Sequence, residues 1–340
     1  MTINSFSDEQ LAGQRIMAGF DGTDFNPDLK YLIKELKIGG IILFSRNIKS
    51  PLQLKELCES VQVYAKSCNQ PPLFISIDQE GGQVARLKKP FTCFPGNPSI
   101  KNNDDAVYFA KITGSELLGV GINMNMAPVI DVSPKDMNSI MAGRTFSHDP
   151  EIVSKLGCIV IKEMQANGIM AVAKHFPGIG RTIIDSHIDL PFMDADIADI
   201  KCFDLVPFYA AFSQEVAGVM LSHILYRSLD PIWPASLSVE IAKKLLRDQM
   251  GFEGLVITDD LDMGAIKKHY EIHAIVEQIL KADIDITLIC HKGPDIETAF
   301  QEILKKIKKA PELRKKGTIS VKRIMKFKNQ YCKVRFPTSI

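Results

Sequence analysis

The amino-acid sequence predicts a single (β/α)8 barrel, in which eight parallel strands form a closed sheet inside a ring of helices. Three observations support this fold class. Eight short apolar runs are spread over the 340 residues, amphipathic stretches lie between most of them, and no long linker or low-complexity region divides the chain. Strands that alternate with helices are typical of a parallel sheet, and eight such units in a chain of this length fit one barrel.

The expected strands are short runs of β-branched and other apolar residues. In chain order they are RIMAGF (15–20), GGIILF (39–44), LFISID (73–78), INMNMAPVIDV (122–132), IMAVAKH (169–175), AGVMLSH (217–223), GLVITD (254–259) and ITLIC (286–290). Apolar residues three and four positions apart indicate helices between them. Examples are SPLQLKELCESVQVYAK (50–66), AVYFAKITGSELLGV (106–120) and PEIVSKLGCIVIKEMQA (150–166).

Composition favours a soluble globular protein, because 46% of the residues are apolar and 24% are charged, both near the average for soluble proteins. The longest apolar runs, such as residues 38–44, are too short to cross a bilayer. Residues 1–10 lack the basic and apolar regions of a secretion signal. Seven scattered cysteines without a C-x-x-C pair indicate reduced, mostly buried thiols. We therefore expect a cytoplasmic protein with no membrane span.

The carboxy-terminal segment is strongly basic. Residues 305–335 contain thirteen Lys or Arg and a single acid, Glu312, although the net charge of the whole chain is only +1. Such a segment can bind nucleic acid or an anionic lipid surface, but no interleaved aromatic residues support nucleic acid as a partner. We expect residues 1–310 to form the barrel and residues 311–340 to form a basic helical tail that packs on an acidic body.

Polar residues stand at or near the ends of several expected strands. They are Asp78, Asp131, Lys174 with His175, His223 and Asp259. Barrel enzymes build their active sites at the carboxyl ends of the strands, so this pattern predicts an active site there. Each residue taken alone can also be a helix cap or a turn former, and Asp131 is interpreted as a turn former because Ser133 and Pro134 follow it.

A dense set of ionisable and turn residues follows an apolar run in AVAKHFPGIGRTIIDSHIDLP, residues 171–191. Lys174 and His175 end an apolar strand, and a proline and two glycines then take the chain out of the sheet. Asp185 and His187 follow, two positions apart, so the carboxylate can bind one imidazole nitrogen and leave the other free for proton transfer. An isolated D-x-H also fits an ordinary surface loop, but its fixed spacing from KHFPG favours a catalytic pair.

Two further segments combine a strand end with carboxylates. In GFEGLVITDDLDMGA (251–265), Asp259 and Asp260 follow an apolar strand, and either can be a nucleophile or a cap of the next helix. In ISIDQEGGQVARL (75–87), Asp78 is followed by Glu80, two glycines and Arg86. The glycines let the backbone turn close to a ligand, and a carboxylate such as Asp78 suits the recognition of sugar hydroxyls.

The pattern KHFPGxGxxxxDSH closely resembles the signature of family 3 glycoside hydrolases of the β-N-acetylglucosaminidase type, single-domain cytoplasmic enzymes of bacterial peptidoglycan recycling. Five blocks between roughly Leu11 and Lys305 carry the resemblance, which leaves the basic tail outside it. Many members have a His between the two glycines, where this chain has Ile179. That difference bears on the packing of the loop and on no known catalytic role.

The resemblance implies a role for each candidate residue. Asp259 is the nucleophile, with Asp260 as its support or a helix cap, and His187 is the general acid/base, oriented by Asp185. The implied substrate contacts are Asp78, Arg86, Lys174, His175 and, in MAGRTFSHDP (141–150), Arg144. Outside this set, His223 is interpreted as a pocket wall or supporting residue, His148, His269 and His273 as surface residues, and His291 is left open.

The implied reaction is retaining hydrolysis of a terminal β-linked N-acetylglucosamine through a covalent intermediate. An imidazole has an ordinary pKa near neutrality and can serve as both acid and base. The alternatives are a β-glycoside phosphorylase, a broader β-glucosidase and a non-catalytic sugar-binding protein. A metal-dependent hydrolase is disfavoured because no H-E-x-x-H or H-x-H element occurs. We expect no cofactor and no metal, a small glycoside as the partner, and a monomer or weak homodimer.

Overall fold

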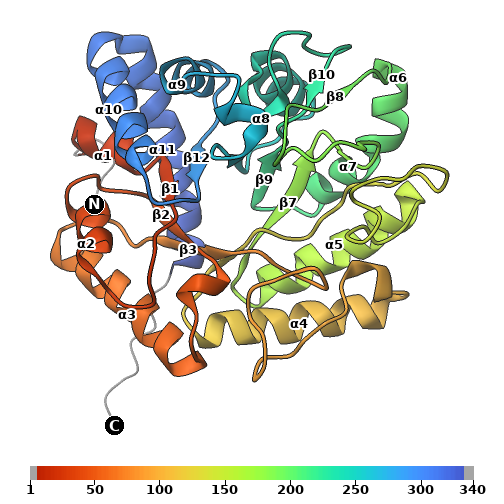
Figure 1. Ribbon diagram of the computed structural model, residues 1–340, viewed down its shortest axis with the longest axis horizontal. Helices are drawn as coiled ribbons and strands as arrows, with labels where there is room; N and C mark the ends of the chain where they lie inside the picture. Colours follow the sequence, from red (N-terminus) through yellow and green to blue (C-terminus); the bar gives the residue numbers. More distant parts are fainter. Residues whose placement is uncertain (1–5, 333–340) are drawn as a thin grey trace.

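Eight parallel strands close into a barrel in the computed structural model, which describes residues 6–332 (Figure 1). The strands are β1 (Ile16–Ala18), β2 (Gly40–Leu43), β3 (Phe74–Ile77), β6 (Met124–Asn125), β7 (Met170–Phe176), β9 (Gly218–Leu221), β11 (Leu255–Asp260) and β12 (Ile286–Ile289). Each lies within or overlaps one expected run, and β1 pairs with β12 to close the sheet. The predicted (β/α)8 fold is therefore confirmed.

The helices surround this barrel (Figure 1). They are α1 (Asp8–Gly13), α2 (Pro27–Lys34), α3 (Pro51–Ser67), α4 (Asn103–Gly119), α5 (Pro150–Ala166), α6 (Ile197–Asp199), α7 (Val206–Ser213), a π-helical segment (Val239–Gln249), α8 (Gly264–Lys267), α9 (Ile272–Lys281), α10 (Pro294–Lys309) and α11 (Pro311–Tyr331). Two small ribbons lie outside the barrel: β4 (Gln79–Gly81) with β5 (Val84–Ala85), and β8 (Phe192–Met193) with β10 (Leu225–Tyr226).

The three amphipathic segments named above form α3, α4 and α5, and each has a capping residue at its start. Ser50, Asn102 and Asp149 accept hydrogen bonds from the backbone N–H groups of Gln53, Asp105 and Glu151. These bonds satisfy donors that a helix start leaves unpaired. The apolar face of each helix is buried, as Leu54, Leu57 and Val61 are in α3. Local sequence and burial therefore favour the same elements.

The fourth strand is much shorter than expected. The apolar run 122–132 predicts one continuous strand, but β6 covers only Met124–Asn125. Pro128 has no N–H to donate to a ladder, and the chain instead follows β7 through single bonds, such as Lys174 N–H to Pro128 O at 3.2 Å. Asp131, at the end of this stretch, is fully buried. The irregular path thus carries a carboxylate into the interior.

The apolar core has two parts. Inside the barrel, Met17, Phe74, Met170 and Leu255 belong to one buried cluster, and a larger cluster fills the layer between the strands and the helices. Such burial is the main favourable contribution to folding. Ile324, Phe327 and Tyr331 of α11 belong to the inner cluster, so this helix covers the amino-terminal end of the barrel.

The basic helix α11 is neutralised in part by acidic residues of the barrel. Arg314 pairs with Asp8 at 2.8 Å and Arg323 pairs with Asp285 at 2.9 Å. In Figure 1, α10 and α11 (blue) lie beside α1 (red), and all three are in contact. The division of the chain at residue 310 stays a prediction, and residues 333–340 of the expected tail lie outside the described residues.

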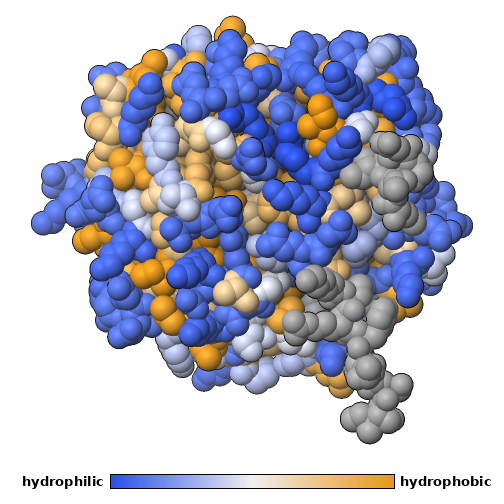
Figure 2. All heavy atoms as spheres, turned by 180° about the vertical axis from the view of Figure 1, so that it is seen from behind, coloured by the Kyte–Doolittle hydropathy of each residue, from blue (hydrophilic) through white to orange (hydrophobic). Residues whose placement is uncertain are grey.

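The outer surface is mostly hydrophilic, with apolar residues in scattered patches on the face seen in Figure 2. Within residues 6–332, no helix is both long and apolar enough to cross a membrane. All seven cysteines lie in this range and are free thiols. Only Cys58, Cys290 and Cys332 are buried, so the expectation that most of the thiols are buried is wrong.

Candidate active site

A cavity of about 150 Å3 opens at the carboxyl ends of the strands. It is lined by seven of the eight predicted site residues: Asp78, Arg86, Arg144, Lys174, His175, His187 and Asp259. Asp185 does not line it but contacts His187 directly. The strands therefore bring together side chains that are far apart in the sequence, as expected for a barrel active site.

Lys174 is the centre of a buried charge cluster. Its Nζ lies 2.8 Å from Oδ1 of Asp78 and 2.7 Å from Oε1 of Glu80, while Arg86 Nη2 lies 3.4 Å from Asp78 Oδ2. Burial alone would raise the pKa of Asp78, but the charges of Lys174 and Arg86 outweigh it and lower this pKa. Asp78 is thus held as a carboxylate, which accepts hydrogen bonds from hydroxyl groups.

Glu80 is a member of this cluster to which the sequence assigned no role. Arg144 forms a two-point contact with it, with Nε at 2.9 Å from Oε2 and Nη2 at 2.7 Å from Oε1. Burial alone would raise the pKa of Glu80, but the charges of Lys174 and Arg144 outweigh this effect and lower the pKa. The available signal was the position of Glu80 two residues after Asp78, because buried cations need a counter-charge close by.

Asp131 is not a mere turn former, and the interpretation made from Ser133 and Pro134 is wrong. Its Oδ2 lies 2.8 Å from Nδ1 of His175, and its Oδ1 accepts the backbone N–H of Ile179 at 2.8 Å. The chain enters the interior here because the strand ladder has ended at β6. A buried carboxylate needs such partners, and here they are His175 near the end of β7 and Ile179 in the loop that follows.

The predicted Asp185 and His187 pair is formed at the surface. Nδ1 of His187 lies 2.8 Å from Oδ1 of Asp185, and the same oxygen accepts the backbone N–H of His187 at 2.9 Å. The side chain of His187 is 70% exposed and that of Asp185 is 47% exposed. Burial raises the pKa of Asp185, but its bonds to His187 outweigh that effect and lower it. Because Nδ1 is occupied, Nε2 is the atom that can exchange a proton with a ligand.

The loop that carries this pair has a buried root and an exposed tip. Ile179 and Thr182 are buried, and a Cβ on Gly180 would lie only 1.9 Å from Val132 O. By contrast, Ile183 and Ile188 are 66% and 65% exposed. Residues 177–182 are therefore fixed by apolar and backbone contacts, whereas the residues that follow them have few buried contacts.

Asp259 and Asp260 differ in how their carboxylates are used. Oδ1 of Asp260 accepts the backbone N–H groups of Cys290 at 2.9 Å and Asp262 at 3.1 Å. Burial raises the pKa of Asp260 to about 6. Within residues 6–332, Asp259 accepts one hydrogen bond, from the N–H of Asp260 at 2.8 Å. Both carboxylates line the cavity, and Asp259 is the one with fewer backbone hydrogen bonds.

The apolar part of the cavity was not predicted from the sequence. It is formed by Ile42, Phe44, Val84, Met220, Met263, Leu288 and Cys290. The guanidinium of Arg86 lies 5.3 Å from the centre of the Phe44 ring, a distance suited to a cation–π contact. Phe44 follows β2 directly, so its place at a strand end was the only available signal.

The remaining histidines lie in different settings. His223 is buried and bonds Ser236 and the backbone oxygen of Asp260. It is a supporting residue rather than part of the cavity wall. His148 and His269 are exposed, while His291 lies beside Asp260 and Asp262.

In the described part of the chain, Asp260, Asp262 and His291 form the one group with the spacing of metal ligands. Asp262 already pairs with Lys267 at 2.9 Å, and Asp260 accepts two backbone N–H groups. Both carboxylates are therefore satisfied by the protein itself.

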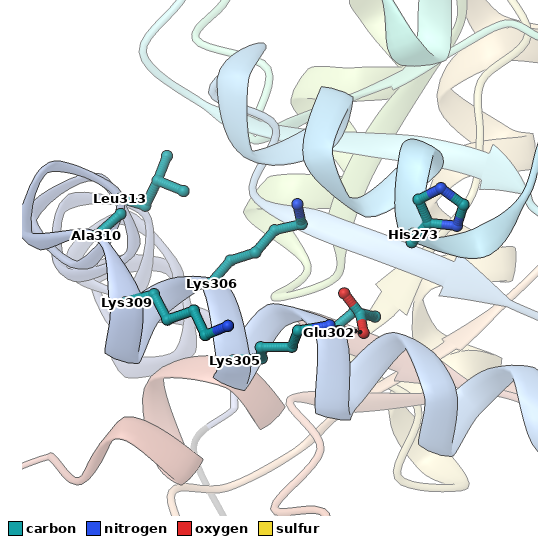
Figure 3. Close-up of a pocket in the computed structure, with 7 residues that line it drawn as sticks. All are labelled: His273, Glu302, Lys305, Lys306, Lys309, Ala310 and Leu313. Atoms are coloured by element: carbon teal, nitrogen blue, oxygen red, sulfur yellow. Dashed lines mark hydrogen bonds and ion pairs between the residues drawn. The ribbon is translucent and has the colours of Figure 1, made fainter.

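A second groove lies away from the strand ends, among α9, α10 and the start of α11 (Figure 3). It is lined by His273, Glu302, Lys305, Lys306, Lys309, Ala310 and Leu313. Lys305 pairs with Glu302 and Lys306 with Glu277, both at 2.9 Å. These pairs neutralise most of the charge, and the groove contains none of the predicted site residues.

Comparisons with known proteins agree with this geometry. The family model "Glycosyl hydrolase family 3 N terminal domain" matches residues 8–330 and so reaches well into the basic segment. A β-hexosaminidase of Nitrosomonas eutropha is 33% identical over 289 residues, which cover 82% of this chain and 81% of that protein. β-Hexosaminidase A of Pseudoalteromonas piscicida is 38% identical, but the match covers 78% of this chain and only 48% of that protein.

Solved structures show the same likeness. A family 3 β-N-acetylglucosaminidase from Paenibacillus sp. matches with a TM-score of 0.94 and 34% identity, over 99% of this chain and 64% of that chain. A β-N-acetylhexosaminidase from Beutenbergia cavernae matches with a TM-score of 0.89 and 27% identity, over 96% of this chain and 99% of that chain. The chain belongs to glycosyl hydrolase family 3, among the β-hexosaminidases of that family.

Proposed function

We propose that this protein hydrolyses terminal β-linked N-acetylglucosamine, with retention of configuration and a covalent glycosyl intermediate on Asp259. The observation that carries the proposal is the cavity itself, where Asp259 and His187 meet a buried set of charged side chains. The names of the relatives, β-hexosaminidase and β-N-acetylglucosaminidase, support the choice of sugar. Fragments of bacterial cell wall and related N-acetyl glycosides in the cytoplasm are the proposed substrates.

The terminal sugar is bound by the charged cluster. Asp78 accepts hydrogen bonds from sugar hydroxyls, while Arg86, Arg144 and Lys174 donate to them. These side chains already bond one another, for example Lys174 to Asp78 at 2.8 Å, so little ordering is needed when the sugar arrives. The apolar residues of the cavity face the carbon skeleton of the sugar.

In the first chemical step, the Asp259 carboxylate attacks the anomeric carbon and the glycosidic bond breaks. His187 gives the proton on Nε2 to the departing oxygen, and Asp185 stabilises the charged form of the ring from the Nδ1 side. The transition state carries positive charge at the sugar ring, which an anionic Asp259 stabilises.

In the second step, His187 is neutral and can take a proton from a water molecule. The water oxygen attacks the anomeric carbon, the bond to Asp259 breaks, and N-acetylglucosamine leaves with its original configuration. A single imidazole thus acts first as an acid and then as a base. The active chain is proposed to be a monomer or a weak homodimer.

Turnover of 4-nitrophenyl N-acetyl-β-glucosaminide, compared with the corresponding glucoside, tests the proposal. The N-acetyl substrate should be strongly preferred, and Asp259→Ala should abolish turnover with little loss of stability. A fluorinated slow substrate should label Asp259. Label on Asp260, or on no carboxylate, would contradict the covalent mechanism. Sugar 1-phosphate as the main product at millimolar phosphate would instead identify a phosphorylase.

A further inference from the structure

We propose that Asp131 is a positioning residue that orients His175 toward the sugar and also holds the root of the catalytic loop. One buried carboxylate then couples the sugar subsite to the placement of His187. The inference rests on the proposed function, because it takes His175 as a sugar contact and His187 as the acid/base. Asp131 itself does not line the cavity.

The first part of the argument is the contact with His175. Nδ1 of this imidazole lies 2.8 Å from Asp131 Oδ2, and the backbone N–H of His175 also points at the carboxylate, at 3.2 and 3.3 Å from its two oxygens. A carboxylate only accepts hydrogen bonds, so the proton of the ring sits on Nδ1. In the neutral ring, Nε2 is then an acceptor, and a sugar hydroxyl is the donor that it fits.

The second part is the contact with the loop. Asp131 Oδ1 accepts the N–H of Ile179 at 2.8 Å, and Ile179 lies eight positions before His187. The neighbouring carbonyl of Gly178 accepts a hydrogen bond from the Tyr226 hydroxyl at 2.8 Å. These two bonds fix the direction in which residues 177–182 leave β7. The exposed tip with Asp185 and His187 starts from this fixed root.

The third part is burial. Asp131 has no exposed surface, and Ile179 and His175 are nearly fully buried. The site is closed to water, so the N–H groups of His175 and Ile179 would be left unpaired if the carboxylate moved away. An unpaired buried donor is costly. Any shift of Asp131 that weakens its bond to His175 therefore also disturbs Ile179. The surface pair of Asp185 and His187 is thus set in place by a second, buried Asp and His pair.

Asp131→Asn separates the two contacts. The Asn side chain can keep its oxygen on the backbone N–H groups of Ile179 and His175. Its NH2 group then faces Nδ1 of His175. Because this NH2 group is a donor, Nδ1 must become an acceptor. The ring proton then moves to Nε2, and the atom facing the sugar changes from acceptor to donor. Asp131→Ala removes the support of both His175 and the loop.

The experiment combines imidazole nitrogen NMR with kinetics on aryl N-acetyl-β-glucosaminides of different leaving groups. In Asp131→Asn, the His175 proton should move from Nδ1 to Nε2, and kcat/KM should fall roughly 10- to 100-fold for all leaving groups alike. In Asp131→Ala, poor leaving groups should lose roughly tenfold more than activated ones, because they depend on the acid.

Ser133→Ala is the matched control. Its hydroxyl is fully buried two positions away and has no hydrogen-bond partner within residues 6–332, so its removal should leave the tautomer and the leaving-group dependence unchanged. If Asp131→Ala does not fold, Tyr226→Phe releases the loop root from the other side and should give the same leaving-group effect without a tautomer change.

The coupling is overturned if Asp131→Asn keeps the wild-type tautomer and kinetics and only lowers the melting temperature. It is equally overturned if loss of Asp131 and release of the loop root affect all leaving groups alike. The His175 tautomer is measured in the free protein, so the outcome of this part of the test does not depend on turnover. Failure of the proposed function shows elsewhere, as activity that survives in Asp259→Ala.

Discussion

Nδ1 of His187 lies 2.8 Å from Oδ1 of Asp185, although more than two thirds of the imidazole is exposed to solvent. An exposed ion pair contributes little to stability, so this contact is not explained by folding. Its effect is to fix which nitrogen of the ring remains available to a ligand.

Asp185→Asn should keep the shape of the loop but weaken support for the charged imidazole. We expect kcat to fall by a factor on the order of 10 to 100 for poor leaving groups and much less for activated aryl glycosides, which need little acid assistance. Steady-state kinetics across a leaving-group series measure this. The same fold-loss for every leaving group would place the pair in binding or folding instead.

Hydrogen exchange should divide the loop 177–191, which carries Asp185 and His187, at residue 182. The backbone N–H groups of Ile179 and Thr182 are bonded to Asp131 and to Ile179 O, so the root should exchange slowly. The tip around Ile183 has few buried contacts and should exchange fast, then slow when a sugar analogue binds. Mass spectrometry of peptides from the loop separates the two parts. Uniform protection in the free protein would speak against a mobile tip.

Asp204→Asn should stabilise the protein at neutral and alkaline pH. Burial raises the pKa of Asp204 to about 7, with Arg181 at 3.3 Å as its one ion pair in the described chain. A raised folded-state pKa means that stability is lost as pH rises from the unfolded value through 7. The gain of the variant should therefore be near zero at pH 4 and on the order of 4 kcal/mol above pH 7. Urea unfolding across this range tests it, and a pH-independent difference would contradict it.

Lys328→Met should stabilise the protein most below pH 7. Burial lowers the pKa of Lys328 to about 7, and its Nζ donates to Gln14 Oε1 at 2.6 Å. A depressed pKa means that stability is lost as pH falls from about 10 toward 7, so the gain should reach on the order of 5 kcal/mol at pH 6. Lys322→Met, on the exposed side of the same helix, should show no such trend in thermal unfolding. A parallel trend in both variants would refute the assignment.

Sequence reasoning succeeded where a local pattern decides the outcome. The eight strands follow from short apolar runs, and the capped helices follow from residues such as Ser50 and Asn102. It failed for the run 122–132, where β6 covers only Met124–Asn125. Apolar content alone does not reveal that the backbone of this run, which includes Pro128 without an N–H, follows β7 irregularly.

The candidate site shows the same division. Residues at strand ends, such as Lys174 and Asp259, were predicted because the carboxyl ends of barrel strands meet at one face of the fold. Glu80 and Asp131 were missed because their importance comes from partners 64 and 44 positions away, Arg144 and His175. Long-range pairing of buried charges leaves no periodic signal in one sequence.

Closure of the barrel has a consequence for the newly made chain. β1 and β12 are neighbours in the sheet, yet roughly 270 residues separate them, which take about 15 to 55 s to synthesise at ordinary rates. During that time one edge of β1 has no partner, and an open strand edge invites pairing with other chains. A helper that shields Ile16–Ala18 on the ribosome, or slow translation before β12, should therefore change the soluble yield without changing the finished enzyme.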